Sequence, residues 1–461
     1  MHASVISLAA CWALVGTGSG CLTGATRQSY DALLRESAAP ASRRGPASPP
    51  GDLEAELARA PRLTTILRLI GERHPELAEA RSRLGGLLER VPAASRLPDL
   101  ELRYEQRGVP VVRPHRLDRA DGIAFGLRQS FPALGLRDAS SRVALEEARA
   151  AAELLRAKER DLLARARRAF IQLYQAEREL ELQQEHVALV GRLVELSRAT
   201  YQSGQGSQHD VLRLVLEQTR QRARLLGLDE ERRLARLQLN TLMARRPDAP
   251  LGVPPPPALA PQSLSAAALE ALLHQHRAEL RAADHAVLRS TAALEASRSV
   301  ARWPTLMIGA DYMVMPAAMD SIHTYGLMLG ANLPWLNPLY ADRQREAEAL
   351  LAADRRAKEN LANLLRQELR EALVRVQTLG RTRHLIHTEL LPQARQSFDA
   401  ARAAYAAGQG EASALVDALR TLLEVRLEEH RTLAQLAAAE VELERAVGRP
   451  VAPAPTSGGD R

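Results

Sequence analysis

The sequence predicts a mainly helical protein with a small amount of β-structure: long antiparallel helices, and four strands in two hairpins. Three observations carry this prediction. The 461-residue chain is rich in Ala, Leu, Arg and Glu and only 3% aromatic, which is typical of long helices rather than a large globular core. Two stretches, 97–131 and 303–334, alternate apolar and polar residues with the period of a strand. The order of helices and strands also occurs twice, which predicts two internal structural repeats.

The charge balance argues against a nucleic-acid-binding protein. The formal net charge is +7, and almost all of the positive charge is arginine, with lysine only at positions 158 and 358. The arginines are interleaved with Glu and Asp along the expected helices, a pattern typical of a solvated helical surface. We therefore expect no nucleic-acid partner.

The first 20 residues are expected to be a secretory signal peptide, because the apolar stretch Val5–Val15 is too short to span a bilayer and small residues follow it. Cys21 follows Gly18-Ser-Gly, which resembles a bacterial lipoprotein cleavage site and predicts lipidation at Cys21. Lipidation at Cys11 and ordinary signal cleavage without a lipid are the alternatives. No later stretch reaches the ~18 apolar residues that a spanning helix needs, so membrane insertion would use strands.

A linker, 21–51, is expected next, with an unpacked Pro-rich part from residue 40. The first repeat then covers 52–248 and begins with helices, the second of which starts at His74-Pro-Glu-Leu. A Pro-rich linker, 249–262, separates it from the second repeat, 263–450, and a disordered tail, 451–461, ends the chain.

Both hairpins have one apolar and one polar side. In the first, Leu102 and Tyr104 alternate with Glu101, Arg103 and Glu105. Strands of this kind have one face for an apolar environment and one for water. The apolar positions are Leu100, Leu102, Tyr104, Ile123, Phe125 and Leu127 in the first hairpin and Leu306, Ile308, Tyr312, Tyr325, Leu327 and Leu329 in the second. Four strands cannot bury such a face within a helical chain, so something outside the protomer is expected to cover it.

Long helices follow each hairpin. Apolar or small residues recur every three or four residues, as in a coiled coil; in the first helix the two spacings alternate, with Glu159 the one break. These positions are Leu145, Ala148, Ala152, Leu155, Leu162, Ala166, Ala169 and Leu173 in the first helix, and Leu350, Ala353, Ala357, Leu361, Leu365, Leu369, Ala372 and Val376 in the second. Helices of this length must pack side by side with others. Pro392 is expected to kink or restart the second helix.

The two halves match at nearly constant offsets. His276-Arg-Ala-Glu-Leu corresponds to His74-Pro-Glu-Leu, and Leu333-Pro corresponds to Phe131-Pro. The turn Tyr405-Ala-Ala-Gly-Gln-Gly corresponds to Tyr201-Gln-Ser-Gly-Gln-Gly. Each of these pieces is weak alone, but their duplicated order over about residues 55–450 resembles the TolC-type outer-membrane efflux proteins, the outer membrane factors.

The resemblance implies a trimer in which each protomer contributes four strands to a 12-stranded transmembrane β-barrel and its helices to a periplasmic α-barrel tunnel. The strands would close into a barrel because lipid leaves no partner for the N–H groups of an open strand edge. The apolar hairpin positions would then face lipid, and Glu101, Arg103, Glu105 and Arg128 would face water. The alternative is a soluble hairpin packed on its own helices.

The resemblance also assigns the turns. They would form the periplasmic tip, where the adaptor docks, through Tyr201, Gly204, Gly206, Tyr405, Gly408 and Gly410. Asp417 matches a position at which the family carries a ring of carboxylates that gates the aperture, and Glu411 lies nearer the turn. Such a ring would bias the aperture toward cations. The alternatives are plain turn residues and a solvated carboxylate.

Methionines cluster in the second hairpin, at Met307, Met313, Met315, Met319 and Met328. Most share the water side with Asp311 and Asn332, so they either fill a narrow barrel or meet Cu(I), which thioethers suit. His384 and His387 have no evident third ligand. We expect no metal site and no cofactor, and no enzyme, since no phosphate loop or nucleophile motif is present.

These interpretations together predict the outer-membrane channel of a tripartite efflux or type I secretion system, with drug or metal efflux expected ahead of protein secretion. The channel would be a passive trimeric exit duct. Its partners would be two identical subunits, a periplasmic adaptor, an inner-membrane pump and outer-membrane lipid, with its helices in the periplasm of a Gram-negative-type bacterium. The alternative is a periplasmic coiled-coil adaptor or scaffold without a channel, which would carry one helical hairpin rather than duplicated ones.

Overall fold

The computed structural model describes residues 22–38, 50–108, 120–204, 206–259, 265–315, 322–407 and 409–450. Its contacts divide the chain into two compact units, each assembled from separate stretches. The strand unit comprises Met1–Ala39, Ala80–Leu154 and Glu279–Leu361, and the helical unit comprises Pro40–Glu79, Leu155–Ala278 and Ala362–Arg461.

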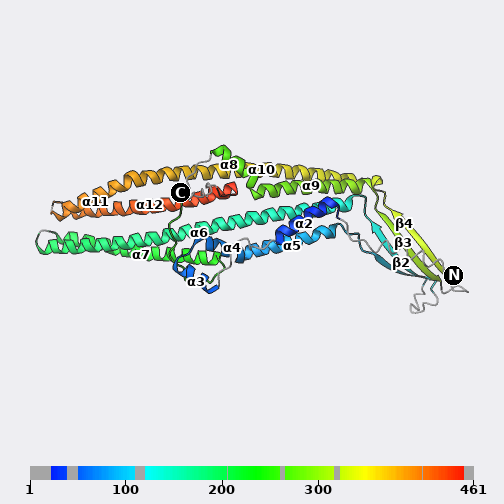
Figure 1. The fold of residues 1–461 in the computed structure, drawn as a ribbon, viewed down its shortest axis with the longest axis horizontal. Coiled ribbons are helices and arrows are strands. Elements are labelled where there is room, and N and C mark those ends of the chain that lie inside the picture. The colour runs from blue at the N-terminus through cyan, green and yellow to red at the C-terminus, as the bar shows by residue number, and fades with distance from the viewer. Residues whose placement is uncertain are drawn as a thin grey trace, which may run out of the picture. The chain divides into compact units, whose positions relative to one another are not determined.

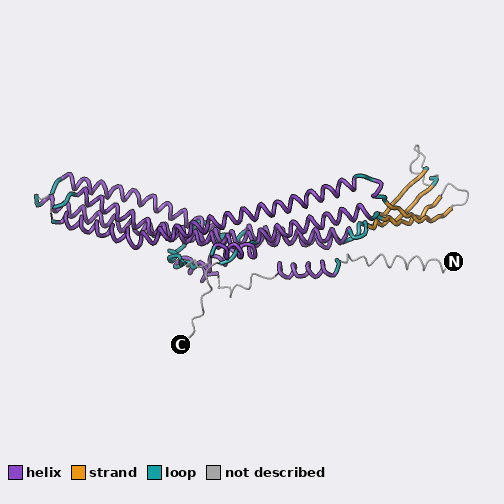
Figure 2. The backbone as a smooth tube through the Cα atoms, turned by 90° about the horizontal axis from the view of Figure 1, so that it is seen from above, coloured by secondary structure: helices purple, strands orange, loops and turns teal. Residues whose placement is uncertain are grey.

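The strand unit contains one antiparallel sheet, in the order β1-β2-β3-β4. The strands are β1 (Glu101–Arg107), β2 (Gly122–Phe131), β3 (Leu306–Met315) and β4 (Ile322–Ala331), and a 3₁₀ turn, η3 (Pro334–Leu336), follows them. The pairing of β2 with β3 joins the two hairpins edge to edge (Figure 1), and the strands are the orange segments of Figure 2. Four strands in two hairpins were predicted from the sequence, and this prediction is confirmed.

Helices flank the sheet in sequence. They are α2 (Gly24–Ala38), the last part of α5 (Pro75–Ala94), the first part of α6 (Leu136–Gln202), α9 (Ala278–Arg302) and the first part of α10 (Leu339–Leu385). Helix α2 lies inside the stretch expected to be a linker, so that expectation is wrong for residues 24–38. The Ala, Ser and Arg residues of this segment are compatible with a helix as well as with a tether. Composition alone therefore does not predict α2, and its contacts with the rest of the unit favour the helix.

The helical unit is built mainly from antiparallel helix pairs. It contains α3 (Pro50–Arg59), α4 (Leu63–Arg73), the rest of α6, α7 (Gln208–Leu242), α8 (Ala266–His276), the rest of α10, the π-helical turn η4 (Ile386–Leu390), α11 (Leu391–Ala406) and α12 (Ala412–Val447). Helix α6 is unbroken over 67 residues, about 100 Å at 1.5 Å per residue. The restart at Pro392 is confirmed, because η4 ends at Leu390 and α11 carries the proline in its first turn.

Two apolar clusters hold this unit together. The first joins α3 and α4 to α6 and α7 through Leu57, Ile66, Ile70, Leu173 and Leu239, all buried. The second joins α6 and α7 to α11 and α12 through Val190, Leu214, Phe398, Leu415 and Leu419. The buried spacing of α6 follows the predicted coiled-coil stripe, since a seam of small and apolar residues lets long helices approach closely.

The predicted stripe of α10 is only partly correct. Leu365, Leu369 and Val376 are buried, but Leu350, Ala353 and Ala357 are exposed. Periodicity identifies an apolar side of a helix but not what covers it, and in the first part of α10 the described protomer buries Leu351 but leaves these three positions exposed. No helix among the described residues is long and apolar enough to cross a membrane.

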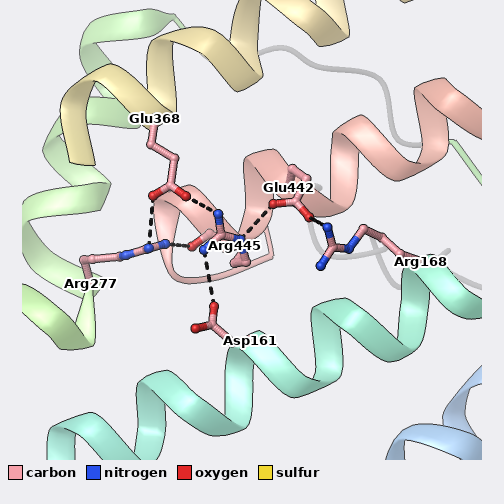
Figure 3. A network of polar contacts seen from close by, with 6 residues as sticks. All are labelled: Asp161, Arg168, Arg277, Glu368, Glu442 and Arg445. Carbon is pink, nitrogen blue, oxygen red and sulfur yellow. Dashed lines mark hydrogen bonds and ion pairs between the residues drawn. The ribbon is translucent and has the colours of Figure 1, made fainter. Parts of the chain in front are cut away.

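An ion-pair network fixes the end of α12 within the helical unit (Figure 3). Arg445 Nη1 lies 3.3 Å from Asp161 Oδ1 on α6, its Nε donates to Glu442 Oε2 at 2.8 Å, and it also pairs with Glu368 on α10. Arg277, at the end of α8, shares Glu368 at 3.1 Å. Burial opposes the charge of Arg445, but the surrounding carboxylates prevail and raise the pKa of its guanidinium. The network therefore joins three long helices at one point.

Candidate functional site

The apolar residues of both hairpins lie on one continuous face of the sheet. Opposite one another in the pairing are Leu102 and Leu127, Ile308 and Leu329, and Ala310 and Leu327. Because side chains alternate along strands, this register places every predicted apolar position within a strand on the same side. Leu102, Leu327 and Leu329 are 76%, 80% and 81% exposed. Leu100 differs slightly, since β1 begins at Glu101 and Leu100 lies just before it, also exposed.

This apolar face carries a row of aromatic side chains that crosses all four strands. Tyr104 pairs with Phe125, Phe125 with Tyr312, and Tyr312 with Tyr325. The rings of Tyr104 and Phe125 are 5.1 Å apart, and Tyr312 Oη lies 2.6 Å from Nδ1 of His323. The sequence predicts these aromatic residues as apolar positions but not their alignment, because the register between hairpins is not a local property.

A second set of aromatic residues lies where the strands end near the helices, formed by Phe131, Trp303 and Trp335. Trp303 and Trp335 are exposed, and the Arg302 guanidinium lies 5.6 Å from the Trp303 ring centre. Phe125 and Phe131 are six residues apart on β2, which is roughly 20 Å along a strand. An apolar band bounded by two aromatic girdles is the pattern of membrane-spanning strands.

The opposite face of the sheet is polar. Glu101 accepts from Arg128 Nε at 2.9 Å, and Glu105 accepts from Arg107 Nε at 2.7 Å. Four of the predicted methionines, Met307, Met313, Met315 and Met328, share this face with Asp311, whereas Met319 lies outside the described residues. The Met328 methyl group lies over Gly309 and the Met307 methyl group over Gly330, so these side chains fill space left by glycines.

The sheet has two open edges within the protomer. Among the described strands, β1 pairs only with β2 and β4 only with β3. The outer backbone groups of both edge strands therefore have no partner strand. In lipid such an edge is unfavourable, because no water is present to satisfy its N–H and C=O groups.

Two further apolar surfaces lie on helices. Helix α7 has exposed leucines along its length, at Leu212, Leu216, Leu226, Leu234 and Leu237. Helix α10 exposes Leu350, Leu364 and Val374. Exposed apolar residues become informative about a contact with another molecule only where they form a continuous surface, and on α7 the spacing of these leucines places them along one side of the helix.

The two Tyr-x-x-Gly-x-Gly turns have matching geometry. Gly204 has a left-handed φ of +74°, and a Cβ on Gly206 would lie 3.2 Å from the backbone nitrogen of Tyr201. In the second turn, a Cβ on Gly410 would lie 3.0 Å from the nitrogen of Tyr405. The last glycine of each turn thus packs against the end of the preceding helix, where only a small residue fits. Tyr405 is buried while Tyr201 is half-exposed, and Gly408 lies outside the described residues.

The two predicted gate carboxylates are accessible. Asp417 is exposed on α12, with its Oδ1 3.8 Å from an Arg420 nitrogen. Glu411 is the residue before α12, and its Oε2 accepts from Ser413 at 2.9 Å. Both side chains are exposed in the described protomer.

Buried polar residues near these turns were missed by the sequence analysis. Glu217 on α7 is 2% exposed and accepts from Arg420 Nε at 3.1 Å. Its hydrogen bonds from Arg420 and Gln221 lower the pKa of Glu217 against the opposing effect of burial. Gln183 on α6 donates to Gln221 Oε1 at 2.8 Å. The sequence does carry a signal for these buried polar residues, since Glu217 and Gln221 are four positions apart and interrupt the apolar side of α7.

His186 is also buried in this group. Burial lowers the pKa of His186 to about 4, and its Nε2 has no hydrogen-bond partner among the described residues. On α6, seven residues before His186, Glu179 accepts a hydrogen bond from Arg431 Nε at 2.9 Å. Burial acts to raise the pKa of Glu179, but the hydrogen bonds from Arg431 and Gln175 lower it. A line of polar contacts thus connects α6 and α7 with α12.

The described residues contain no evident metal site. No three His, Cys, Asp or Glu residues within the described ranges are grouped as a metal site would require. His387 instead pairs with Glu429, its Nδ1 lying 2.7 Å from Oε1. Cys21, the predicted lipidation site, lies outside the described residues.

The arrangement of one apolar-faced antiparallel sheet and long helix pairs defines the fold class of outer-membrane channel proteins. VceC, an outer-membrane protein of Vibrio cholerae, matches with a TM-score of 0.70 and 17% identity over 84% of this chain and 96% of that chain. The open-state MtrE channel of Neisseria gonorrhoeae matches with a TM-score of 0.68 and 19% identity over 85% and 90%. CusC, studied for transmembrane channel formation, matches with a TM-score of 0.72 and 16% identity over 84% of this chain and 92% of that chain.

No protein-family model matches the sequence, and no curated protein matches it. The predicted resemblance to the TolC-type outer membrane factors is confirmed in fold, which combines long antiparallel helices with a four-stranded antiparallel sheet.

Proposed function

We propose that this protein is the outer-membrane channel of a tripartite export system, and that three copies assemble into a passive exit duct. The observation that carries the proposal is the sheet, with its exposed apolar face, its polar reverse and its two open edges. Pairing β4 of one copy with β1 of the next removes every open edge. Three copies then give a closed barrel of 12 strands, which is an even number within the range of outer-membrane barrels.

The exposed helix surfaces support the same assembly. The leucines of α7 and the exposed start of α10 lie on helices that would form the wall of a tunnel. In a trimer each helix has neighbours from another copy, so these apolar residues are covered by the coiled-coil packing that their periodicity predicts. This also explains why the predicted α10 stripe is exposed in one protomer.

The energy for transport would come from partners. The sequence contains no phosphate-binding loop, so we propose an inner-membrane pump as the motor and a periplasmic adaptor that docks at the turns containing Tyr201, Gly206, Tyr405 and Gly410. We expect drug or metal efflux rather than protein secretion. Cys21 would carry a lipid that anchors the protein to the outer membrane.

The aperture would be gated by Asp417, with Glu411 nearby. Three copies of Asp417 would form a ring of negative charge, and such rings favour cations over anions. The carboxylate is exposed, and the nearest Arg420 nitrogen lies 3.8 Å away.

The test is conductance of the detergent-purified protein in planar bilayers, together with its mass. We expect a trimer that fractionates with outer membranes and conducts with cation preference. Asp417→Asn should reduce that preference at least twofold. Asp399→Asn is the matched control, because Asp399 on α11 is also exposed and pairs with an arginine three residues later, at 3.6 Å. A water-soluble monomer would contradict the proposal.

A further inference from the structure

A cavity of about 600 Å³ lies in the strand unit, where the sheet meets its helices. Phe131, Leu134, Trp303 and Leu306 form its apolar walls, together with two prolines. Phe131 pairs with Leu306 on the apolar face of the sheet. The cavity is therefore continuous with the surface that we place in lipid.

The other end of the cavity is polar. Its lining there includes Ser95, Arg137, Asp138 and Ser141. Arg137 Nε donates to the carbonyl of Ser95 at 2.7 Å, and Ser141 Oγ donates to the carbonyl of Asp138 at 2.8 Å. An apolar wall with a polar end suits a ligand with a hydrocarbon chain and a polar attachment.

The start of the described chain is fixed at this polar end. Thr23 Oγ1 donates to Asp138 Oδ1 at 2.8 Å and lies 2.9 Å from Oγ1 of the buried Thr26. Asp138 is one of the residues that line the cavity. In the sequence, Cys21 is only two positions before Thr23.

From these observations we infer that the cavity is the binding site for a fatty acyl chain carried by Cys21. The inference rests on the proposed lipidation of Cys21. Thr23 and Asp138 would hold the attachment point at the polar end, and the chain would lie against Trp303, Leu134 and Leu306. Burial of its methylene groups in this apolar wall would stabilise the bound chain.

The experiment uses a fatty acid with a diazirine and a terminal alkyne, fed to a Gram-negative host that produces the full-length protein. The trimer is purified from outer membranes and photolysed, and cross-linked peptides are identified by mass spectrometry. We expect the label of Cys21 to cross-link to 131–141 and 303–306. Label that reaches only the open face around Leu327 and Leu329 would overturn the inference.

Matched variants sharpen the test. Leu134 and Leu336 are exposed to similar extents, 70% and 72%, but only Leu134 lines the cavity. Leu134→Glu should reduce cross-linking to the cavity at least fivefold, whereas Leu336→Glu should leave it unchanged. An equal effect of both variants would contradict a specific site.

Two further results would overturn the inference without touching the channel proposal. One is a conducting trimer whose Cys21 carries no label. The other is cavity cross-linking that persists in Cys21→Ser exported behind an ordinary cleavable signal, since the occupant would then be a membrane lipid. Conductance measured on the same preparations separates these outcomes from failure of the channel itself.

Discussion

Arg420 on α12 and Glu217 on α7 form a bidentate ion pair between residues that are 203 positions apart in the chain. Nε of Arg420 donates to Oε1 of Glu217 at 3.1 Å, and its Nη2 contacts the other carboxylate oxygen. Glu217 is buried, so its charge depends on this partner. The pair therefore ties α12 to α7 three residues from Asp417, which we assign to the aperture, and opening that moves α12 away from α7 must separate the pair.

Replacing this arginine should loosen the closed state. Arg420→Ala leaves the Glu217 carboxylate buried without its cation, and removing one partner of a buried pair costs about 3 kcal/mol, less here because Arg420 is partly exposed. We expect more frequent open events in single-channel recordings and a lower melting temperature.

Arg402→Ala is the matched control for that variant. Arg402 pairs with Asp399 on the exposed surface of α11, and surface pairs contribute less than about 1 kcal/mol. Equal effects of the two substitutions would show that the Arg420–Glu217 pair does not restrain α12.

The buried imidazole of His186 should make stability depend on pH. The folded pKa is about 4, below the unfolded value of about 6.5. Between these values only the unfolded chain binds the proton, so the contribution is complete above pH 6.5 and is lost as the pH falls toward 4. It amounts to roughly 3 kcal/mol.

His186→Leu should flatten this part of the curve of unfolding free energy against pH, measured at constant protein concentration. The dependence should not vanish, because burial also lowers the pKa of His430. His209→Leu controls for the loss of an exposed imidazole on α7. An unchanged slope in His186→Leu would mean that the imidazole is hydrated in the assembled protein.

The last glycine of the second turn should not tolerate a side chain. A Cβ at Gly410 would lie 3.0 Å from the Tyr405 backbone nitrogen and 3.2 Å from Ala404. Since backbone atoms cannot move aside cheaply, Gly410→Ala should destabilise the turn by about 1–3 kcal/mol. The measurement is proteolytic nicking at the turn.

Gly227→Ala, in the same unit, is expected to have the opposite effect on stability. A Cβ there meets nothing within 4 Å, and alanine is favoured over glycine inside a helix by about 1 kcal/mol. This variant should be neutral or stabilising. Faster nicking in both variants would remove the steric explanation.

A charge on the apolar face should impair assembly. Leu327 lies in the middle of β4, and arginine near the centre of a membrane-spanning strand costs about 2–4 kcal/mol. Leu327→Arg should lower the yield of trimer in outer membranes. Thr324→Arg, on the opposite face of the same strand, should be nearly neutral, and similar losses from both would argue against a lipid-facing side.

The sequence allowed the strands to be predicted because their alternation is a local property. Leu102, Tyr104 and Phe125 reveal a two-residue period without any knowledge of neighbours. The aromatic row across four strands depends on register between hairpins that are far apart in the chain, and only the structure supplies it.

Contacts between helices could not be predicted from the sequence for a related reason. The contacts of Glu217 with Arg420 and of Glu179 with Arg431 depend on which helices are neighbours, and the apolar period does not specify this. The α10 stripe shows the converse, since Leu350 has the predicted period but is exposed in the described protomer. Helix α2 was missed because its composition fits a linker equally well.

The most direct test of the channel account compares two adjacent residues of β4. Leu327→Cys and Met328→Cys would be made in a background with Cys21 blocked by its lipid or replaced, and treated in intact outer membranes with a membrane-impermeant thiol reagent and with a lipid-soluble one. The account predicts that position 328 reacts with the aqueous reagent and position 327 only with the lipid-soluble one. Equal aqueous labelling of both positions would contradict a sheet that faces lipid on one side and a water-filled channel on the other.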